Sequence, residues 1–171
     1  MRVIAGSARG RPLVAPAGST TRPTLDRVRE AMFNALGSLV PIAGASVVDL
    51  FAGSGALGVE ALSRGAARAT FCDVDAAARR AVTANLEATG FADRATVLAV
   101  DALVHAAAAD PVDVAFCDPP HRFDRWDELF GVVRADVVVV ESDRAVEPPE
   151  PWVVVRSKRY GGTVVTFVRH R

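Results

Sequence analysis

Five Val- and Ala-rich runs alternate with amphipathic stretches through most of this 171-residue chain, and this alternation restricts the fold more than any other feature. Runs that are apolar at consecutive positions are typical of parallel strands covered on both faces. The runs span residues 46–51, 69–74, 95–100, 112–117 and 136–140, and the stretches span residues 56–64, 76–89, 102–109 and 124–133. The sequence therefore predicts an α/β fold with a parallel sheet between helices.

Two further strand-like runs, 152–158 and 163–168, follow a proline-rich linker at 147–151. The Tyr160-Gly161-Gly162 turn between them predicts a hairpin, which adds antiparallel strands to one edge of the sheet. Before the first run, apolar residues repeat at helical spacing from Leu25, and Thr24 is the candidate N-cap. The Gly-, Pro- and Arg-rich residues 1–23 predict a basic arm, and residues 24–171 predict one domain.

The formal net charge is zero, but its distribution is uneven. Residues 1–29 hold six Arg against Asp26 alone, and residues 156–171 hold five basic residues and no acid. This concentration of positive charge at both ends of the chain predicts that both ends contact an anionic partner. Because the chain has no apolar signal core and no run of about 20 apolar residues, we expect a cytoplasmic protein that does not enter membranes. We expect Cys72 and Cys117 to be reduced and buried.

A glycine-rich turn follows the first run. Gly53, Gly55 and Gly58 match the dinucleotide fingerprint G-x-G-x-x-G, and Asp73, at the end of the second run, is placed to bind ribose hydroxyls. Asp49 lies four residues before the first glycine, where a carboxylate would repel a pyrophosphate but suits a cation such as an ammonium.

Two other acids follow apolar runs in the same way. Asp101, after the third run, is placed either to bind an adenine amino group or to cap the next helix, and both interpretations stay open. Asp75 is more simply explained as the N-cap of the helix that begins at residue 76.

The segment Asp118-Pro119-Pro120-His121 ends the fourth run. Prolines fix φ and lack N–H groups, so they present bare carbonyl groups in a rigid frame. Asp118 and one carbonyl form an acceptor pair that matches a planar amino group, and the ring of His121 or Phe123 can stack on a flipped base. The alternative is a rigid turn with no ligand.

The chain resembles the class I S-adenosylmethionine-dependent amino-methyltransferases in three features taken together: the motif D-x-F-x-G-x-G, an acid after the next strand, and the motif D-P-P. The segments 2–13, 22–36 and 50–58 narrow the resemblance to the bacterial small-subunit (16S) ribosomal RNA guanine-N2 methyltransferases, over nearly the whole chain. The chain departs from this family at His121, where the family usually has Phe or Tyr, and at Asp73, where Glu is common.

The resemblance implies a Rossmann-like seven-stranded sheet of order 3-2-1-4-5-7-6 with strand 7 antiparallel. It implies S-adenosylmethionine as cofactor and methylation of the exocyclic N2 amine of one guanine in 16S rRNA, of the guanine-966 type, on assembled or assembling small subunits. No histidine has partners at metal-ligand spacing, so we expect no metal, and we expect a monomer.

The resemblance also implies the site residues. Those for the cofactor are Asp49, Phe51, Ala52, Gly53, Gly55, Asp73, Val74, Asp101 and Ala102. Those for catalysis are Asp118, Pro119, Pro120 and His121, and those for RNA phosphates are Arg2, Arg9, Arg11 and Arg22. One of Arg22, Arg27 and Arg29 is a candidate partner for the cofactor carboxylate.

Three alternatives remain. Another D-P-P amino-methyltransferase would act on DNA adenine or a protein amide, although 171 residues leave no room for a large DNA-recognition domain. A catalytically silent RNA-binding protein is disfavoured by the intact Asp49, Gly53, Gly55 and Asp118. A dinucleotide oxidoreductase leaves the Asp118 segment unexplained.

Overall fold

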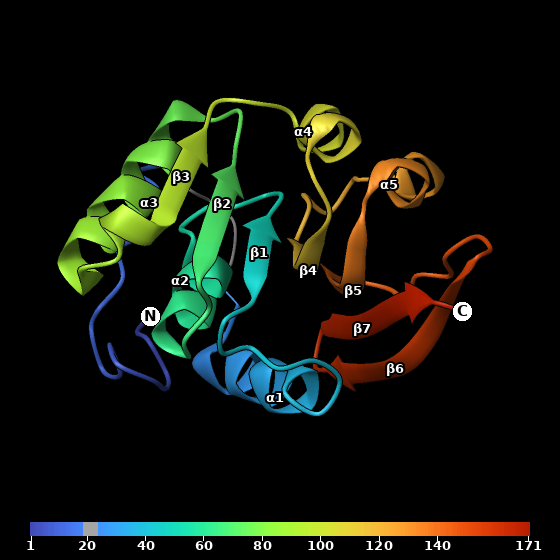
Figure 1. Ribbon diagram of the computed structural model, residues 1–171, viewed down its shortest axis with the longest axis horizontal. Coiled ribbons are helices and arrows are strands. Elements are labelled where there is room, and N and C mark those ends of the chain that lie inside the picture. Colours follow the sequence, from blue (N-terminus) through green and yellow to red (C-terminus); the bar gives the residue numbers. More distant parts are fainter. Residues whose placement is uncertain (19–23) are drawn as a thin grey trace.

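The computed structural model describes residues 1–18 and 24–171, which fold around one sheet of order β3-β2-β1-β4-β5-β7-β6 (Figure 1). The strands are β1 (Ser46–Asp49), β2 (Arg68–Cys72), β3 (Ala95–Leu98), β4 (Val112–Cys117), β5 (Ala135–Ser142), β6 (Trp152–Tyr160) and β7 (Thr163–His170). Pairing is parallel from β3 through β5, whereas β7 is antiparallel to both β5 and β6. The predicted strand order and the antiparallel seventh strand are confirmed.

Helices cover both faces of this sheet (Figure 1). The helices are α1 (Asp26–Leu36), α2 (Ala56–Ser63), α3 (Ala76–Thr89), α4 (Ala102–Ala108), α5 (Trp126–Val132) and the short 3-10 helix η1 (Ala92–Arg94). Helices α1, α2 and α3 pack with one buried cluster, and α4 and α5 pack with the other. Among the described helices, none is both long and apolar enough to cross a membrane.

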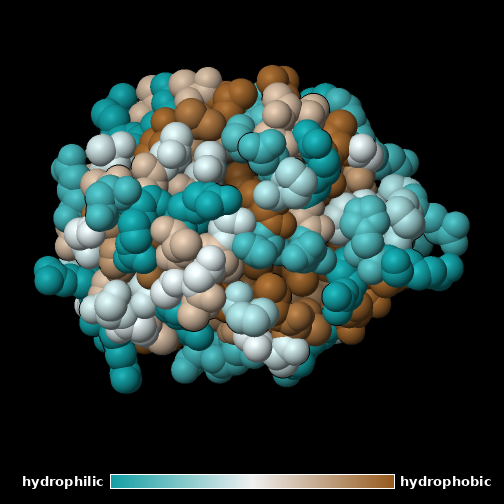
Figure 2. All heavy atoms as spheres, viewed as in Figure 1, coloured by the Kyte–Doolittle hydropathy of each residue, from teal (hydrophilic) through white to brown (hydrophobic). Residues whose placement is uncertain are grey.

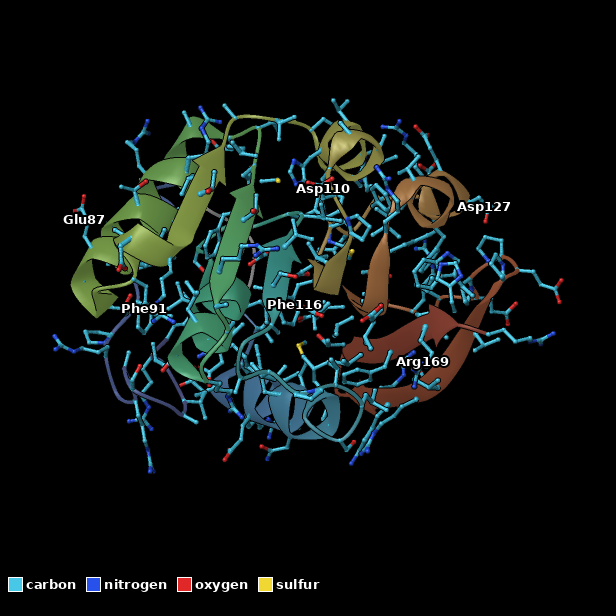
Figure 3. The ribbon with its side chains drawn as sticks, viewed as in Figure 1. Glu87, Phe91, Asp110, Phe116, Asp127 and Arg169 are labelled. Carbon is cyan, nitrogen blue, oxygen red and sulfur yellow. The ribbon has the colours of Figure 1, made fainter. Side chains whose placement is uncertain are left out.

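The central strands are apolar at consecutive positions because each face packs against helices. In β4, Phe116 packs toward α1, where its ring centroid lies 5.4 Å from that of Phe33 (Figure 3). Its neighbour Cys117 packs with the opposite cluster, and Cys72 does the same from β2. Both cysteines are buried free thiols, as predicted.

On the face of the molecule shown in Figure 2, hydrophobic residues are visible over the middle, between hydrophilic margins.

The prediction that Thr24 caps the first helix is wrong. Helix α1 begins at Asp26, and Leu25 occupies its N-cap position with no side-chain hydrogen bond. The hydroxyl of Thr24 instead donates a hydrogen bond to Oε2 of Glu141 in β5, at 2.6 Å. The Thr24 side chain therefore bonds to a distant strand and not to the start of α1. A hydrogen bond from a hydroxyl to a carboxylate is stronger than the neutral hydrogen bond that a capping hydroxyl makes with a backbone N–H.

The first 14 residues pack against the body of the protein. They turn back on themselves through a bridge between Arg2 and Pro12, and they bury Val3, Ala8 and Leu13. The apolar residues of the predicted arm thus contribute to the core beside α2 and α3, while Arg9 and Arg11 stay exposed. Arg22 and the predicted boundary after residue 23 lie outside the described residues.

Two buried polar side chains hold this segment in place. Glu60 of α2 accepts a hydrogen bond from the backbone N–H of Ile4 at 2.8 Å. Asn85 of α3 accepts one from the N–H of Val14 at 2.8 Å and donates to the carbonyl oxygens of Val14 and Ser54, at 2.9 and 2.8 Å. Because Ser54 belongs to the glycine-rich turn, Asn85 joins the N-terminal segment directly to that turn.

Candidate active site

A cleft of about 990 Å³ opens where the strands of the parallel part of the sheet end. Ligands of open α/β sheets bind at this edge. The cleft brings together most of the residues predicted for the cofactor and for catalysis: Asp49, Phe51, Ala52, Gly53, Asp73, Val74, Asp101, Ala102, Asp118, Pro119, Pro120 and His121. It leaves out Gly55, Arg2, Arg9 and Arg11. One cleft therefore contains both predicted halves of the site.

Two glycines of the turn allow close packing beneath the cleft and do not line it. Gly55 begins α2 with a φ of 76°, and a Cβ there would lie 3.1 Å from Cγ2 of Val82. A Cβ on Gly58 would lie 2.3 Å from Cε1 of Phe71. These two glycines let α2 pack closely on α3 and β2, so the structure places Gly55 beneath the cleft and not in its lining.

Asp49, the last residue of β1, is 1% exposed and lines the cleft. Its Oδ2 accepts a hydrogen bond from the N–H of Gly58 at 3.2 Å, while its Oδ1 has no hydrogen-bond partner in the described part of the chain. Burial raises the pKa of Asp49 to about 7, against the opposing effect of the Gly58 N–H, and the charge of Asp73 raises it further. A buried acceptor without a partner fits a cationic ligand group, such as the ammonium of an amino acid.

Asp73 and Asp101 both order backbone near the cleft. Asp73 accepts hydrogen bonds from the N–H groups of Gly53 and Asp75, each at 2.9 Å, so it fixes the glycine-rich turn. Asp101 accepts from the N–H of Leu103 at 2.9 Å, which confirms its helix-capping alternative, although it also lines the cleft. Asp75 caps α3, as predicted.

Asp118 follows β4 and has a carboxylate neighbour that the sequence analysis did not name. Burial raises the pKa of Asp118 well above its usual range, and the charges of Glu141 and Asp49 raise it further. Glu141 of β5 is 8% exposed, lines the same cleft and has a raised pKa, chiefly through burial. The pattern that located Asp49, an acid after an apolar run, also occurs at Glu141 and could have found it.

Aromatic rings line the cleft beside the Asp-Pro-Pro segment. The ring of Phe123 packs edge-on against those of Phe51 and Trp126, with centroids 5.3 and 4.8 Å apart. Phe123 is therefore held in a packed cluster, whereas His121 is exposed at the rim. Within the described residues, the buried Nε1 of Trp126 has no hydrogen-bond partner.

Two of the arginines considered as partners for the cofactor carboxylate, Arg27 and Arg29, lie in different environments. Arg27 lines the cleft, but Arg29 has a fully buried side chain and forms an ion pair with Asp26 at 3.0 Å. The interpretation of Arg29 as a cofactor ligand is therefore wrong, because its guanidinium belongs to an internal ion cluster with Asp26 and Glu60.

Comparison with known proteins agrees with this geometry. The family model described as "Conserved hypothetical protein 95" matches residues 1–169. YlbH of Bacillus subtilis is 40% identical over 185 residues, which cover 100% of each chain. Ribosomal RNA small subunit methyltransferase D of Escherichia coli is 38% identical over 172 residues, with 94% of this chain and 85% of that protein covered. The solved structure of yhhF from Escherichia coli superposes with a TM-score of 0.86 at 37% identity, over 100% of this chain and 98% of that one.

The chain belongs to the ribosomal RNA small-subunit methyltransferase D family. Its fold is the class I methyltransferase fold, as the strand order and the structural neighbours both indicate. In this member of the family, the cleft also gathers residues that sequence reasoning did not assign to it. Among them are Thr24, Arg125, Glu141, Ser142, Asp143, Arg144 and residues 160–163. Most of these lie at or just after the end of β5, or where β6 turns into β7, and only the tertiary fold brings those segments to the carboxyl edge of the sheet.

Proposed function

We propose that the protein transfers a methyl group from S-adenosylmethionine to the exocyclic N2 amine of a guanine in 16S rRNA, on assembled or assembling small subunits. The observation that carries the proposal is the cleft in which Asp118-Pro119-Pro120 lies beside the glycine-rich turn and the unpartnered Oδ1 of Asp49. The relative named ribosomal RNA small subunit methyltransferase D supports RNA as the substrate class.

The residues present fit the proposed cofactor. Oδ1 of Asp49, which has no partner among the described residues, suits the ammonium of the amino-acid part of the cofactor. Asp73 lines the cleft where ribose hydroxyls would bind, and Arg27 is a cleft-lining cation for the carboxylate of the cofactor. When bound, S-adenosylmethionine supplies an electrophilic methyl group on a sulfonium.

The Asp-Pro-Pro segment would position the acceptor amine. Asp118 and the Pro119 carbonyl would accept the two N2–H groups and so orient the nitrogen lone pair for attack. The new C–N bond would form at N2 as the methyl group leaves sulfur, and the proton that N2 loses would pass to the Asp118 carboxylate. Catalysis by this route depends chiefly on orientation, and no metal ion or separate base is needed.

Cofactor affinity is expected to rise with pH between about 6 and about 8. In the free protein Asp49 holds a proton below its pKa of about 7, whereas an ammonium ligand requires the carboxylate. Binding therefore releases a proton at low pH, and affinity should increase by up to about tenfold per pH unit there and level off above pH 7. Calorimetric titration of the protein with cofactor, in buffers of different ionisation enthalpy, would measure the number of protons released on binding. Affinity that is constant over this range, with Asp49→Asn equal to the wild type, would contradict the assignment.

The exposed edge strand β6 offers a surface for RNA phosphates. Residues 154–159 are all exposed, they include Arg156, Lys158 and Arg159, and the turn that follows them lines the cleft. Reversing Arg156 and Lys158 to Glu is expected to weaken rRNA binding at least about tenfold and to flatten its salt dependence. Cofactor affinity should not change. Filter binding at several salt concentrations would measure this, with Arg68→Glu plus Arg80→Glu as a charge-matched control on β2 and α3.

The proposed function is tested by methyl transfer from labelled S-adenosylmethionine to unmodified small subunits, naked small-subunit RNA and duplex DNA. Nucleosides would be identified by mass spectrometry. N2-methylguanosine from subunits or their RNA is the expected product. Label in DNA alone would favour the DNA amino-methyltransferase alternative, and cofactor binding with no product in any acceptor would favour the silent RNA-binding protein.

A further inference from the structure

Strand register places Glu141 beside Asp118. In the parallel pair of β4 and β5, Cys117 is opposite Val140, so the next residue of each strand is an acid in the following row. Phe116 and Val139 belong to the cluster on the α1 face, and side chains two residues further along lie on that same face. Neighbouring strands are about 4.8 Å apart, which puts the two carboxyl groups next to each other.

The hydrogen bond from Thr24 confirms the direction of the Glu141 side chain. Thr24 lies two residues before α1, and its hydroxyl donates to Oε2 at 2.6 Å, so Glu141 points along the α1 face into the cleft. This contact occupies one oxygen and fixes the rotamer, which leaves Oε1 as a second acceptor. Among the described residues, neither Glu141 nor Asp118 forms an ion pair within 4.0 Å.

Both carboxyl groups resist ionisation. Burial raises the pKa of Asp118 and the charge of Glu141 raises it further, and burial raises the pKa of Glu141 against the opposing effects of the Thr24 hydroxyl and the charge of Arg29. A ligand with two neighbouring hydrogen-bond donors would satisfy both groups. The Watson–Crick edge of guanine has such a pair, N1–H beside the N2 amine, whereas adenine has an acceptor at N1.

We propose that Glu141 is a specificity-determining residue that accepts the N1–H of the target guanine while Asp118 binds its N2 amine. This inference rests on the proposed function and deepens it, since it names the group that separates guanine from other purines that carry an amine at C2. Thr24 then acts as a positioning residue, because it orients the carboxylate without touching the base.

The test compares guanine with 2,6-diaminopurine, which keeps the C2 amine but has an acceptor at N1. Either base would be placed at the acceptor position, once mass spectrometry has located it, in otherwise identical reconstituted subunits. Wild-type protein is expected to methylate guanine at least about 100-fold faster, because the carboxylate would face an acceptor in the analogue. Glu141→Gln is expected to reduce this ratio at least about tenfold, since a carboxamide can either accept or donate a hydrogen bond.

Asp136→Asn, at the exposed start of the same strand, is the matched control and should keep the wild-type ratio. Thermal melting and cofactor titration would verify that Glu141→Gln is folded. A folded Glu141→Gln variant with the wild-type ratio would overturn the inference and leave the proposed function intact. Wild-type protein that forms no N2-methylguanosine would overturn the proposed function and this inference with it.

Discussion

Replacing Asp118 with Ala is expected to lower the rate of methyl transfer by about 10³-fold or more while cofactor affinity changes by less than about threefold. The loss has two parts: the charged hydrogen bond that orients the amine, and the acceptor for the proton that the amine releases. Asp118→Asn keeps one acceptor oxygen in the same place, so its rate should lie between those of the wild type and Asp118→Ala. Single-turnover transfer with saturating cofactor would measure these rates without interference from product release.

The lower rates expected for the Asp118 variants should not result from a loss of folding stability. Because burial raises the pKa of Asp118 well above its usual range, ionising this carboxyl group costs more free energy in the folded state than in the unfolded state, so Asp118 contributes no stability above its usual pKa. Both variants should therefore melt at or above the wild-type temperature, and the exposed Asp136→Ala should behave like the wild type in both assays. Rates for Asp118→Ala within about tenfold of the wild type would remove Asp118 from the proposed chemistry.

The second large effect is expected in stability, at Glu60. Its side chain is fully buried and accepts hydrogen bonds from the N–H groups of Ile4 and Ala5, at 2.8 and 3.0 Å, and from Nε of Arg64, at 2.8 Å. Nε of Arg29, another fully buried group, lies 3.9 Å from its Oε2. Glu60→Ala should lower the free energy of unfolding by about 3–5 kcal/mol, because it leaves buried cations and N–H groups without their acceptor.

Urea denaturation would measure this change, with Glu87→Ala as the control. Glu87 is exposed on α3 and points away from the body of the protein (Figure 3), so its removal should change stability by less than about 0.5 kcal/mol. Protease cleavage within residues 1–14 should become faster only in the Glu60 variant. A loss below about 1 kcal/mol would mean that burial of Val3, Ala8 and Leu13 holds the N-terminal segment without the ion cluster.

The sequence predicted best those features whose signals are local. Helix α3 begins and ends at the predicted residues because Asp75 caps its start and Gly90 ends it in the left-handed conformation. Strand β4 also has its predicted bounds, because Asp110 and Pro111 precede it and Asp118-Pro119 follows it. The remaining strands were located to within a few residues. The runs of the central strands are apolar because both faces are buried, and the glycine turn at 161–162 marks where β6 ends and β7 begins.

What sequence reasoning missed depends on residues that are distant in the chain. Thr24 has every local property of an N-cap, yet its hydroxyl bonds to a residue 117 positions away. Arg29 is one of the sequence-based candidates for the cofactor carboxylate, although it lies in a buried ion cluster with Glu60 of another helix. Glu141 follows an apolar run as Asp49 does, but its position beside Asp118 becomes apparent only from the register with β4, because one strand alone does not reveal which residue will lie beside it.

The bonds that hold the N-terminal segment also determine when this protein can finish folding during synthesis. Residues 1–14 leave the ribosome before α2 and α3, but Ile4 and Val14 bond to side chains 56 and 71 positions later in the chain. This segment must therefore wait until α2 and α3 have emerged, and contacts of such long range form late. Because Asn85 bonds to both Val14 and Ser54, the glycine-rich turn becomes fixed only when that early segment has returned to it.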